Sequence, residues 1–259
     1  MASLQHLWEI KQVLVCFNHR HTAKRAAGHA GKGMIDMSVL RFGSVLGLVL
    51  ALAIAACGPV TTQPSSSPAK GASSTQISAT KYAALHDGMR KLWEDHITWT
   101  RLYIVSAAAD LPDATATATR LLQNQTDIGN AVKPYYGDGA GTALTALLKD
   151  HIGIAVDIVA AAKGGDTAKF EAANKKWYAN MADISALLSS ANPRSWPLAQ
   201  LQPMMRMHLD LTLAEASARL HGDWAADVSA YEQVHVHILQ LADELTNGIV
   251  TQFPEKFSD

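Results

Sequence analysis

The sequence predicts an all-α protein whose main domain is an antiparallel six-helix bundle built from three helical-hairpin repeats. From about Ala79 onward, apolar residues recur at spacings of three and four, which places them on one face of a helix. No stretch shows the strict alternation of a strand. Glycine, proline and Asn/Asp signals interrupt the pattern at intervals of helical length, so each uninterrupted stretch is interpreted as one helix.

Five breaks separate the six predicted helices. Residues 110–113 (DLPD) end the first helix and cap the second, and residues 134–141, with Pro134 and three glycines, separate the second from the third. Residues 164–166 (GGD) combine a glycine stop with an aspartate N-cap. Residues 192–193 (NP) end the fourth helix, and residues 221–223 (HGD) repeat the stop-and-cap pattern before the sixth. Connections this short favour antiparallel neighbours.

A histidine interrupts the apolar stripe in several of these helices. The first stripe contains His96, and the sixth is predicted to bury Trp224, Val228, Tyr231, His235, Ile238, Ala242, Leu245 and Ile249. His151 and His208 take similar positions in the third and fifth helices.

The histidines also indicate an internal repeat. His96, His151 and His208 are 55 and 57 residues apart, and the last two precede a Gly-Asp turn at the same spacing. After each turn comes a polar pair: Asn124 and Asp127, then Asn180 and Asp183, and in the third unit His237 and Gln240. This pattern predicts three helical hairpins of common design.

In each hairpin the outward and return lengths are nearly equal, so the histidine and the polar pair should lie at one height. We therefore expect a polar layer across the bundle. Its candidate members are His96, His151, His208, His235, His237, Asn124, Asp127, Asn180 and Asp183.

Two interpretations of this layer are open. The histidines are either core residues hydrogen-bonded across the hairpins, or they converge on a ligand or metal, as inward-facing imidazoles and carboxylates do in other bundles. The metal, if any, is not identified: the di-iron pattern Glu-x-x-His occurs only at Glu232–His235. Met204, Met205 and Met207 next to His208 would suit copper(I) or haem iron, but methionines also serve as core filler.

Other activities find little support in the sequence. No glycine-rich phosphate loop, dinucleotide-binding fingerprint or Gly-x-Ser-x-Gly elbow is present. Arg101 and Arg120 could hold an anion or could be solvated surface charges. No nucleophile–base pair can be assembled, so an enzyme ranks below a binding or a structural protein.

An apolar run of 15 residues from Phe42 to Ala56 follows Arg41 and leads into Cys57. A positive flank, a short apolar core and small residues are typical of a secretory signal peptide. With the cysteine directly after Ile54-Ala55-Ala56, the run resembles a bacterial lipoprotein signal, which implies that Cys57 becomes the acylated first residue. An uncut transmembrane helix is disfavoured, because the run spans about 22 Å and a hydrocarbon core about 30 Å.

The lipoprotein signal divides the chain into four parts. Residues 1–36 are a leader that is either cleaved or precedes a true translation start at Met34 or Met37. Residues 37–56 are the signal peptide, residues 57–78 a disordered Ser/Pro/Thr-rich tether, and residues 79–259 the helical bundle.

Composition limits the partners of the mature chain. Residues 57–259 hold 16 of the 22 Lys/Arg and 21 of the 23 Asp/Glu side chains, and this mildly acidic balance argues against nucleic acid. Cys16 lies in the leader and Cys57 is consumed by lipid, so no thiol remains for a disulfide or a metal.

Four stretches from Lys81 to Phe257 are similar to a family of small helical bacterial proteins. They are residues 92–101 (LWEDHITWTR), 133–137 (KPYYG), 176–180 (KWYAN) and 252–257 (QFPEKF). The resemblance implies the all-helical domain and implies no activity.

We therefore expect a lipid-anchored lipoprotein on the extracytoplasmic face of the cell membrane or outer membrane, with the membrane as its partner through an acyl chain such as palmitate. Its expected function is to bind a small ligand or a metal at the polar layer. The alternative is a structural or interaction lipoprotein of the cell envelope, whose histidines only hold the bundle together. No protein partner is implied.

Overall fold

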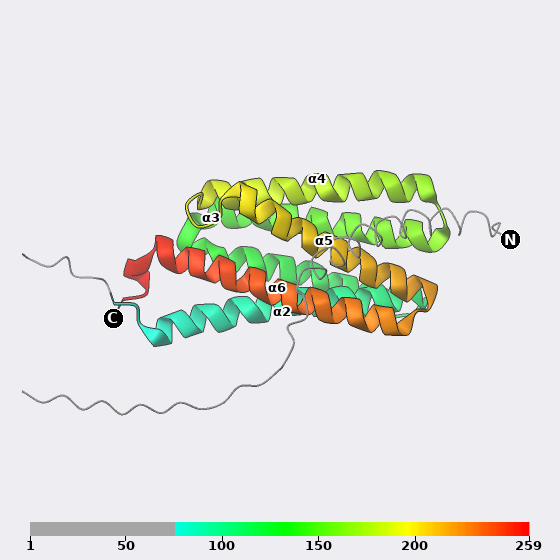
Figure 1. The fold of residues 1–259 in the computed structure, drawn as a ribbon, viewed down its shortest axis with the longest axis horizontal. Coiled ribbons are helices and arrows are strands. Elements are labelled where there is room, and N and C mark those ends of the chain that lie inside the picture. The colour runs from blue at the N-terminus through cyan, green and yellow to red at the C-terminus, as the bar shows by residue number, and fades with distance from the viewer. Residues whose placement is uncertain (1–75, 259) are drawn as a thin grey trace, which may run out of the picture. The chain divides into compact units, whose positions relative to one another are not determined.

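The computed structural model describes residues 76–258, and most of this part of the chain is helical (Figure 1). Its elements are α2 (Ala79–Ala108), α3 (Ala114–Gly164), α4 (Thr167–Ala191), α5 (Leu198–His221), α6 (Trp224–Gln252) and the 3-10 helix η1 (Pro254–Lys256). Within residues 76–258 the only β-type pairing is an isolated bridge between Ile77 and Ser258. The all-α prediction is confirmed. The predicted leader, the signal peptide, Cys57 and residues 57–75 of the tether lie outside the described residues.

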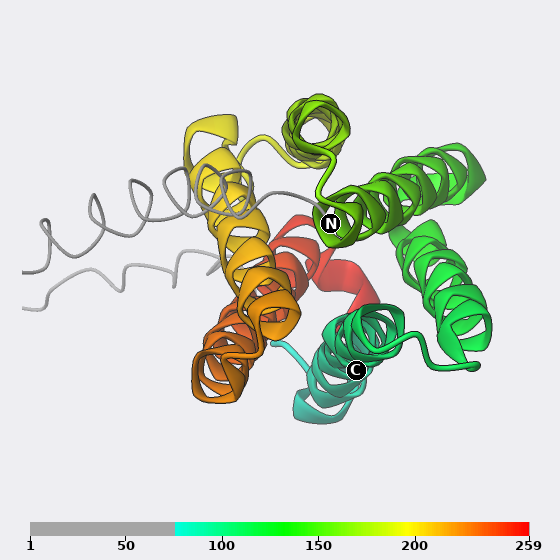
Figure 2. The same ribbon diagram turned by 90° about the vertical axis from the view of Figure 1, so that its right-hand side faces the viewer.

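The five long helices pack as a closed ring in chain order. Each helix contacts the next one along the chain, and α6 returns to pack against α2. Turning the molecule by 90° shows the helices around a shared interior (Figure 2). Among the described helices, none combines the length and the apolar character needed to cross a membrane.

The structure differs from the prediction in the number of helices. Six were predicted, but five are counted, because the predicted second and third helices run together as α3. The predicted break at residues 134–141 shrinks to a kink at Gly137, where φ is 81° and ψ is 168°. Only glycine adopts this backbone region without strain, and it redirects the chain within a single residue.

A close backbone contact holds the two halves of α3 together beyond the kink. A Cβ atom on Gly129 would lie 1.9 Å from Thr145 Oγ1 and 2.6 Å from the Gly141 carbonyl oxygen. Thr145 Oγ1 in turn donates to that carbonyl at 2.9 Å. The halves therefore fold back on each other, and glycine is required where they meet.

The predicted stops and caps at two of the helix connections are present. Gly165 and Gly222 end α3 and α5 in the left-handed conformation, with φ of 68° and 73°. Asp166 then accepts from Lys169 N at 3.0 Å, and Asp223 accepts from Ala226 N at 3.1 Å. Asp113 occupies the N-cap position of α3, but its side chain makes no capping bond.

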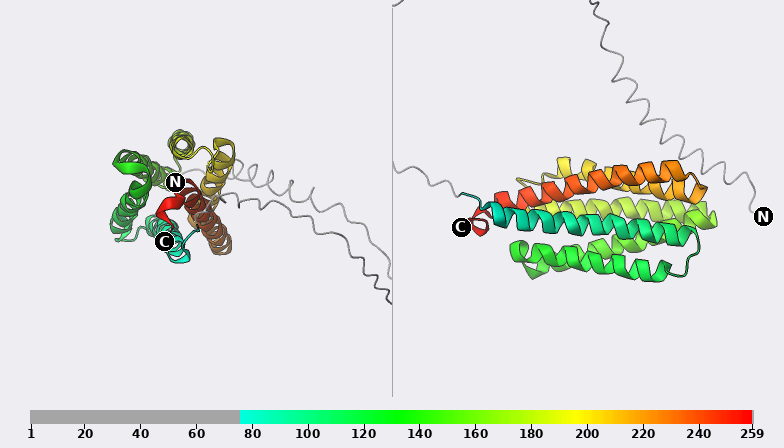
Figure 3. Two further views of the ribbon diagram at one scale, coloured as in Figure 1. Left: turned by 90° about the vertical axis from the view of Figure 1, so that its left-hand side faces the viewer. Right: turned by 90° about the horizontal axis from the view of Figure 1, so that it is seen from below.

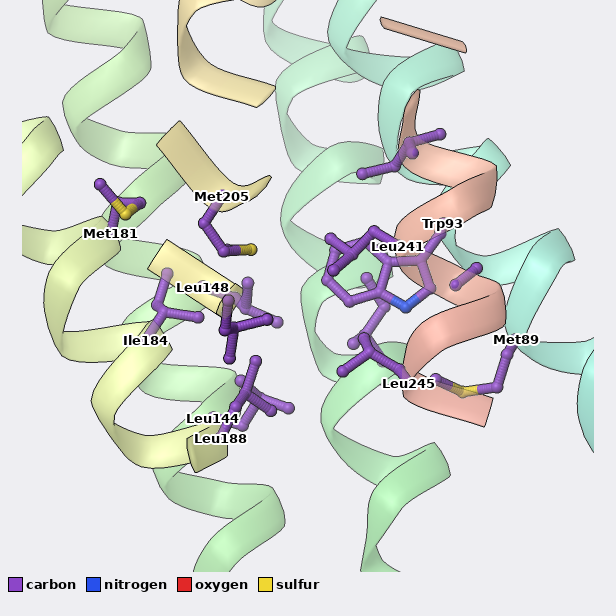
Figure 4. Close-up of a cluster of buried hydrophobic side chains, with 14 of the residues drawn as sticks. Met89, Trp93, Leu144, Leu148, Met181, Ile184, Leu188, Met205, Leu241 and Leu245 are labelled. Carbon is purple, nitrogen blue, oxygen red and sulfur yellow. The ribbon is translucent and has the colours of Figure 1, made fainter. Parts of the chain in front are cut away.

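One core runs along the interior of the bundle (Figure 4). Trp93 from α2, Leu144 from α3, Leu188 from α4 and Leu245 from α6 meet in it, each at most 7% exposed. The side chains within this core come from all five long helices, so its burial couples every helix to the others.

The buried face of α6 differs from the predicted one near the start of the helix. Trp224 is 59% exposed and Val228 50% exposed, and Asp227 lies between them at 1%. Towards its C-terminal end the predicted stripe is correct, since Ile238 and Ile249 are fully buried. The first turns of α6 are thus rotated so that Asp227 points inward.

The two ends of the described chain meet at one end of the bundle. Ser78 N donates to Phe257 O at 2.6 Å, and Ser78 is buried. Figure 3 shows the start of α2 beside the C-terminal segment. Ile77 and Ser78, which the sequence assigned to the tether, are therefore fixed to the bundle by the residues after α6.

The Gly137 kink leads to a first prediction. Gly137→Ala should lower the free energy of unfolding by about 1–3 kcal/mol, because its φ of 81° and ψ of 168° strain any residue with a Cβ. Gly139→Ala is the matched control: its added Cβ meets nothing within 4 Å and its φ is not positive. Urea denaturation of both variants measures the difference, and equal stability of the two would contradict the role given to Gly137.

Candidate functional site: a buried histidine layer

Four histidines from four helices lie at one level of the interior, and we call them the histidine layer. They are His96 on α2, His151 on α3, His208 on α5 and His237 on α6, each at most 7% exposed. His208 is central: the centroid of its ring lies 5.6 Å from that of His96 and 6.5 Å from those of both His151 and His237.

Hydrogen bonds to the backbone fix the level of the layer in the same way three times. Asn124 Nδ2 donates to Leu92 O at 3.0 Å, which is the carbonyl four residues before His96. Asn180 Nδ2 donates to Leu147 O at 3.0 Å, four residues before His151. His237 Nε2 contacts Met204 O at 2.9 Å, four residues before His208. In each case a side chain on the following helical segment is hydrogen-bonded to the backbone of the segment that carries the histidine.

These contacts determine the tautomers of two rings. Because Asn180 Nδ2 donates to Leu147 O, its Oδ1 is the atom that faces His151 Nδ1, at 2.9 Å. His151 therefore carries its proton on Nδ1 and keeps a lone pair on Nε2. His237 must donate from Nε2 to the Met204 carbonyl, which leaves the lone pair on Nδ1.

His96 has the opposite arrangement. Gln125 Nε2 lies 3.2 Å from His96 Nδ1 and also contacts two acceptors, Leu121 O and Asn124 Oδ1. An amide nitrogen only donates, so His96 Nδ1 accepts and its proton is on Nε2. His208 Nδ1 is buried and has no hydrogen-bond partner.

Burial keeps the layer uncharged. It lowers the pKa of His96 to about 3, with a further contribution from the nearby His151, and it lowers the pKa of His151 to about 4. For His208, burial and the three surrounding histidines lower the pKa well below its ordinary value. Burial also lowers the pKa of His237. At neutral pH all four rings are therefore neutral imidazoles.

Two tryptophans enclose the layer. Trp177 stacks on His151 with centroids 4.9 Å apart, and its Nε1 donates to the His151 carbonyl at 3.1 Å. Trp93 meets His96 edge-on at 5.8 Å. Both tryptophans belong to the apolar core, so the core reaches up to the imidazoles.

Three predicted members do not join the layer. His235 pairs with the exposed Glu94 at 2.9 Å, because the rotation of α6 turns it to the surface. Asp127 contacts Gln123 at 3.0 Å on the outside of α3, and Asp183 is exposed. The structure does bring together the other six predicted residues: His96, His151, His208, His237, Asn124 and Asn180.

Gln125, which no pattern in the sequence singled out, is fully buried and contacts His96. Its position directly after Asn124 was the available signal, since both residues lie on the inner side of the same turn. Gln240, predicted beside His208, is exposed instead.

No group of three or more His, Cys, Asp or Glu side chains within residues 76–258 is arranged to hold a metal ion as the rings stand. The imidazole centroids in a tetrahedral site lie about 5 Å apart, given metal–nitrogen bonds of about 2 Å. Compared with the observed separations from His208, the His96 ring would have to approach by about 0.6 Å, and the His151 and His237 rings by about 1.5 Å each.

A second buried polar cluster lies between α2, α5 and α6. Arg101 donates to Glu215 at 2.8 Å and to Asp227 at 2.7 Å, and both carboxylates are 1% exposed. Arg219 also contacts Asp227, at 3.4 Å. Burial raises the pKa of Glu215 to about 7, against the opposing effect of the Arg101 guanidinium. Arg101, considered above as an anion ligand or a surface charge, is therefore occupied by an internal ion pair.

Comparison with protein families, curated proteins and solved structures finds no match to this chain. The function must therefore be inferred from the chemistry of the site.

The neutrality of the layer predicts how the metal-free protein responds to acid. An unfolded histidine takes up a proton near pH 6.5, whereas His151 in the fold resists protonation down to about pH 4. The contribution of such a histidine to the free energy of unfolding is therefore fully present above about pH 6.5 and is lost as the pH falls. Between pH 7 and pH 5 this loss is about 2 kcal/mol for each such histidine.

Denaturant titrations at pH 7, 6 and 5 measure this loss in the wild type and in His151→Leu. The variant should lose about 2 kcal/mol less than the wild type between pH 7 and pH 5. His221→Leu, at the exposed end of α5, controls for the loss of a histidine as such. Identical pH dependence of the wild type and His151→Leu would contradict the assignment.

Proposed function

We propose that the bundle is a binding module for a divalent transition-metal ion, held at the histidine layer of a lipid-anchored lipoprotein. The observation that carries this proposal is the tautomeric state of His151 and His237. Each ring donates one N–H outward, to Asn180 Oδ1 or to Met204 O, and keeps the other nitrogen as a free lone pair. Metal-bound histidines are oriented by this kind of outer hydrogen bond to a carbonyl or carboxylate.

The proposed ligands are His151 Nε2, His237 Nδ1 and one nitrogen of His208, the ring that lies between them. Since His208 Nδ1 has no partner, the ring can turn without losing a hydrogen bond at that atom. His96 is not a ligand in this proposal, because coordination through Nε2 would move its proton to Nδ1, against the amide hydrogens of Gln125.

The protonation state of the layer also favours a metal. A histidine must be neutral to coordinate, and at neutral pH no proton has to be displaced from these rings. Imidazole nitrogens suit zinc, copper and nickel, whereas calcium and magnesium prefer oxygen ligands. We therefore propose zinc, copper(II) or nickel as the class of ion.

One observation favours the alternative, a structural or interaction lipoprotein without a ligand. The layer already makes hydrogen bonds to Asn180, Gln125 and Met204, and such bonds are how buried polar groups are normally satisfied. The two functions differ in what His208 does, since its unpaired nitrogen contributes nothing to a purely structural layer.

We also propose that the bundle consists of three helical-hairpin repeats. The three equivalent bonds to the carbonyl four residues before His96, His151 and His208 support this. So does the fold-back of α3 at Gly137, since its two halves then count as separate helices and the bundle as six.

Metal analysis and binding titrations of protein purified without a histidine tag test the metal site. We expect about one equivalent of ion per chain and, with Co²⁺ as a spectroscopic probe, absorption bands typical of nitrogen coordination. Asn180→Ala should weaken binding by about 10–100-fold, because it removes the outer partner of His151.

Two leucine variants separate the metal site from the structural alternative. His208→Leu should abolish binding, and His235→Leu, a surface histidine near the layer in sequence, should leave it unchanged. If the protein binds no ion and His208→Leu folds normally with increased stability, the metal proposal is wrong and the structural alternative holds.

The anchor is proposed from the residues 42–57 that resemble a lipoprotein signal. Mass spectrometry of the membrane-bound protein should find an N-terminal Cys57 that carries acyl chains, with residues 1–56 removed. Cys57→Ser should abolish both the acyl chains and the membrane association. An unmodified Cys57 in a chain that keeps residues 37–56 would contradict the anchor.

A further inference from the structure

The histidine layer offers a bound metal ion no negative charge. Its four rings are neutral, and the two carboxylates predicted to join it, Asp127 and Asp183, lie outside it. Within residues 76–258 the buried carboxylates are Glu215 and Asp227, and both are paired with Arg101. A divalent ion in the layer therefore keeps its whole positive charge inside the core unless an anion from solution accompanies it.

An uncompensated charge at this depth is costly. An ion in the interior loses its hydration, and only charges or dipoles placed around it offset that loss. Each histidine of the layer is at most 7% exposed, so solvent shields the site poorly. A tetrahedral ion with three protein ligands keeps its fourth position open to a small molecule from solution. The proposed ligands, His151, His208 and His237, leave this position open, and charge balance favours an anion in it.

His96 supplies a hydrogen-bond donor for such an anion. Its Nδ1 accepts from Gln125 Nε2 at 3.2 Å, so the ring proton is on Nε2, which points away from Gln125. Within residues 76–258, Gln125 is the one hydrogen-bond partner of this ring, and the Nε2 proton is therefore unused. Of the three rings around His208, that of His96 is the closest, with centroids 5.6 Å apart. It is also near enough to His151 for that ring to lower its pKa.

We infer that the layer binds a small anion together with the metal, and that the anion accepts a hydrogen bond from His96 Nε2. The anion takes the fourth position on the ion and displaces a water molecule from it. This inference rests on the metal site proposed above, and it makes His96 a positioning residue. Because all four rings are buried, the anion is limited to a few atoms, as in hydroxide, cyanide or azide.

Azide is a suitable probe, because it is a small anion that binds to open positions on metal ions. Added to the Co²⁺-loaded protein, it should change the visible absorption of the ion in a saturable way, with about one azide per ion. NMR of the Zn²⁺-loaded, ¹⁵N-labelled protein follows the imidazole N–H signals. Azide should move one of these proton signals downfield, and the same signal should be absent from His96→Phe.

The variant His96→Phe keeps an aromatic ring and removes the donor. It should bind azide about tenfold more weakly, which corresponds to the loss of one hydrogen bond, and it should bind Co²⁺ as tightly as the wild type. His235→Phe, which changes a histidine that pairs with the exposed Glu94, is the matched control and should leave azide binding unchanged.

Two results would overturn the inference and leave the metal site standing. One is Co²⁺ binding without any response to azide, and the other is equal azide binding by the wild type and His96→Phe. If Co²⁺ itself does not bind, the metal site is wrong and the anion site with it. Should His96→Phe fail to fold, the wild type decides, because imidazole N–H signals that do not move at saturating azide exclude the hydrogen bond from His96.

Discussion

The burial of four imidazole rings at one level constrains the packing of every helix around them. Each histidine is at most 7% exposed, so partners for its ring nitrogens come from neighbouring helices at the same height. Asn124 and Gln125 on the first half of α3 and Asn180 on α4 are placed where they meet this need. A shift of one turn along any of these helices would break a bond at the layer and a bond to a carbonyl together. The histidine layer therefore sets the register of the bundle, while the apolar core on both sides supplies most of the stability.

The protein buries polar groups in two different ways. In the histidine layer the groups are neutral, because burial removes the proton, and their lone pairs remain available at neutral pH. In the cluster of Arg101, Glu215 and Asp227 the groups are paired across three helices, so the guanidinium is already occupied by carboxylates. Only the first arrangement leaves binding capacity, and for this reason the proposed function rests on the histidines and not on the buried ion pairs. Trp93 lies beside this polar level, where its ring meets that of His96 edge-on at 5.8 Å.

Much of the layer was predictable because, in a helical hairpin, the number of residues to the turn and back sets the position of each residue along the bundle axis. The equal spacing from each histidine to its turn and back predicted that Asn180 lies beside His151, and their side chains are 2.9 Å apart. His235 and Asp127 were misplaced because residues one helical turn apart differ little in a periodicity argument. A rotation of a helix by a few tens of degrees then decides which residue is buried. On α6 this rotation is set by Asp227, whose inward position is fixed by Arg101 on a helix more than a hundred residues earlier. No local pattern carries that information, since a buried aspartate is recognisable only from its partner.

The sequence by itself determined the helical class, the stop and cap residues at Gly165, Asp166, Gly222 and Asp223, and all four histidines of the layer. These are local properties, governed by spacing of 3.6 residues per turn and by backbone preferences of single residues. Tertiary structure alone decided that the break predicted at residues 134–141 narrows to Gly137, that His235 does not join His237 in the layer, and that Trp93 Nε1 is left without a partner. Each of these depends on which atoms of distant segments come within a few ångströms, and that distance is fixed only when all the helices pack together.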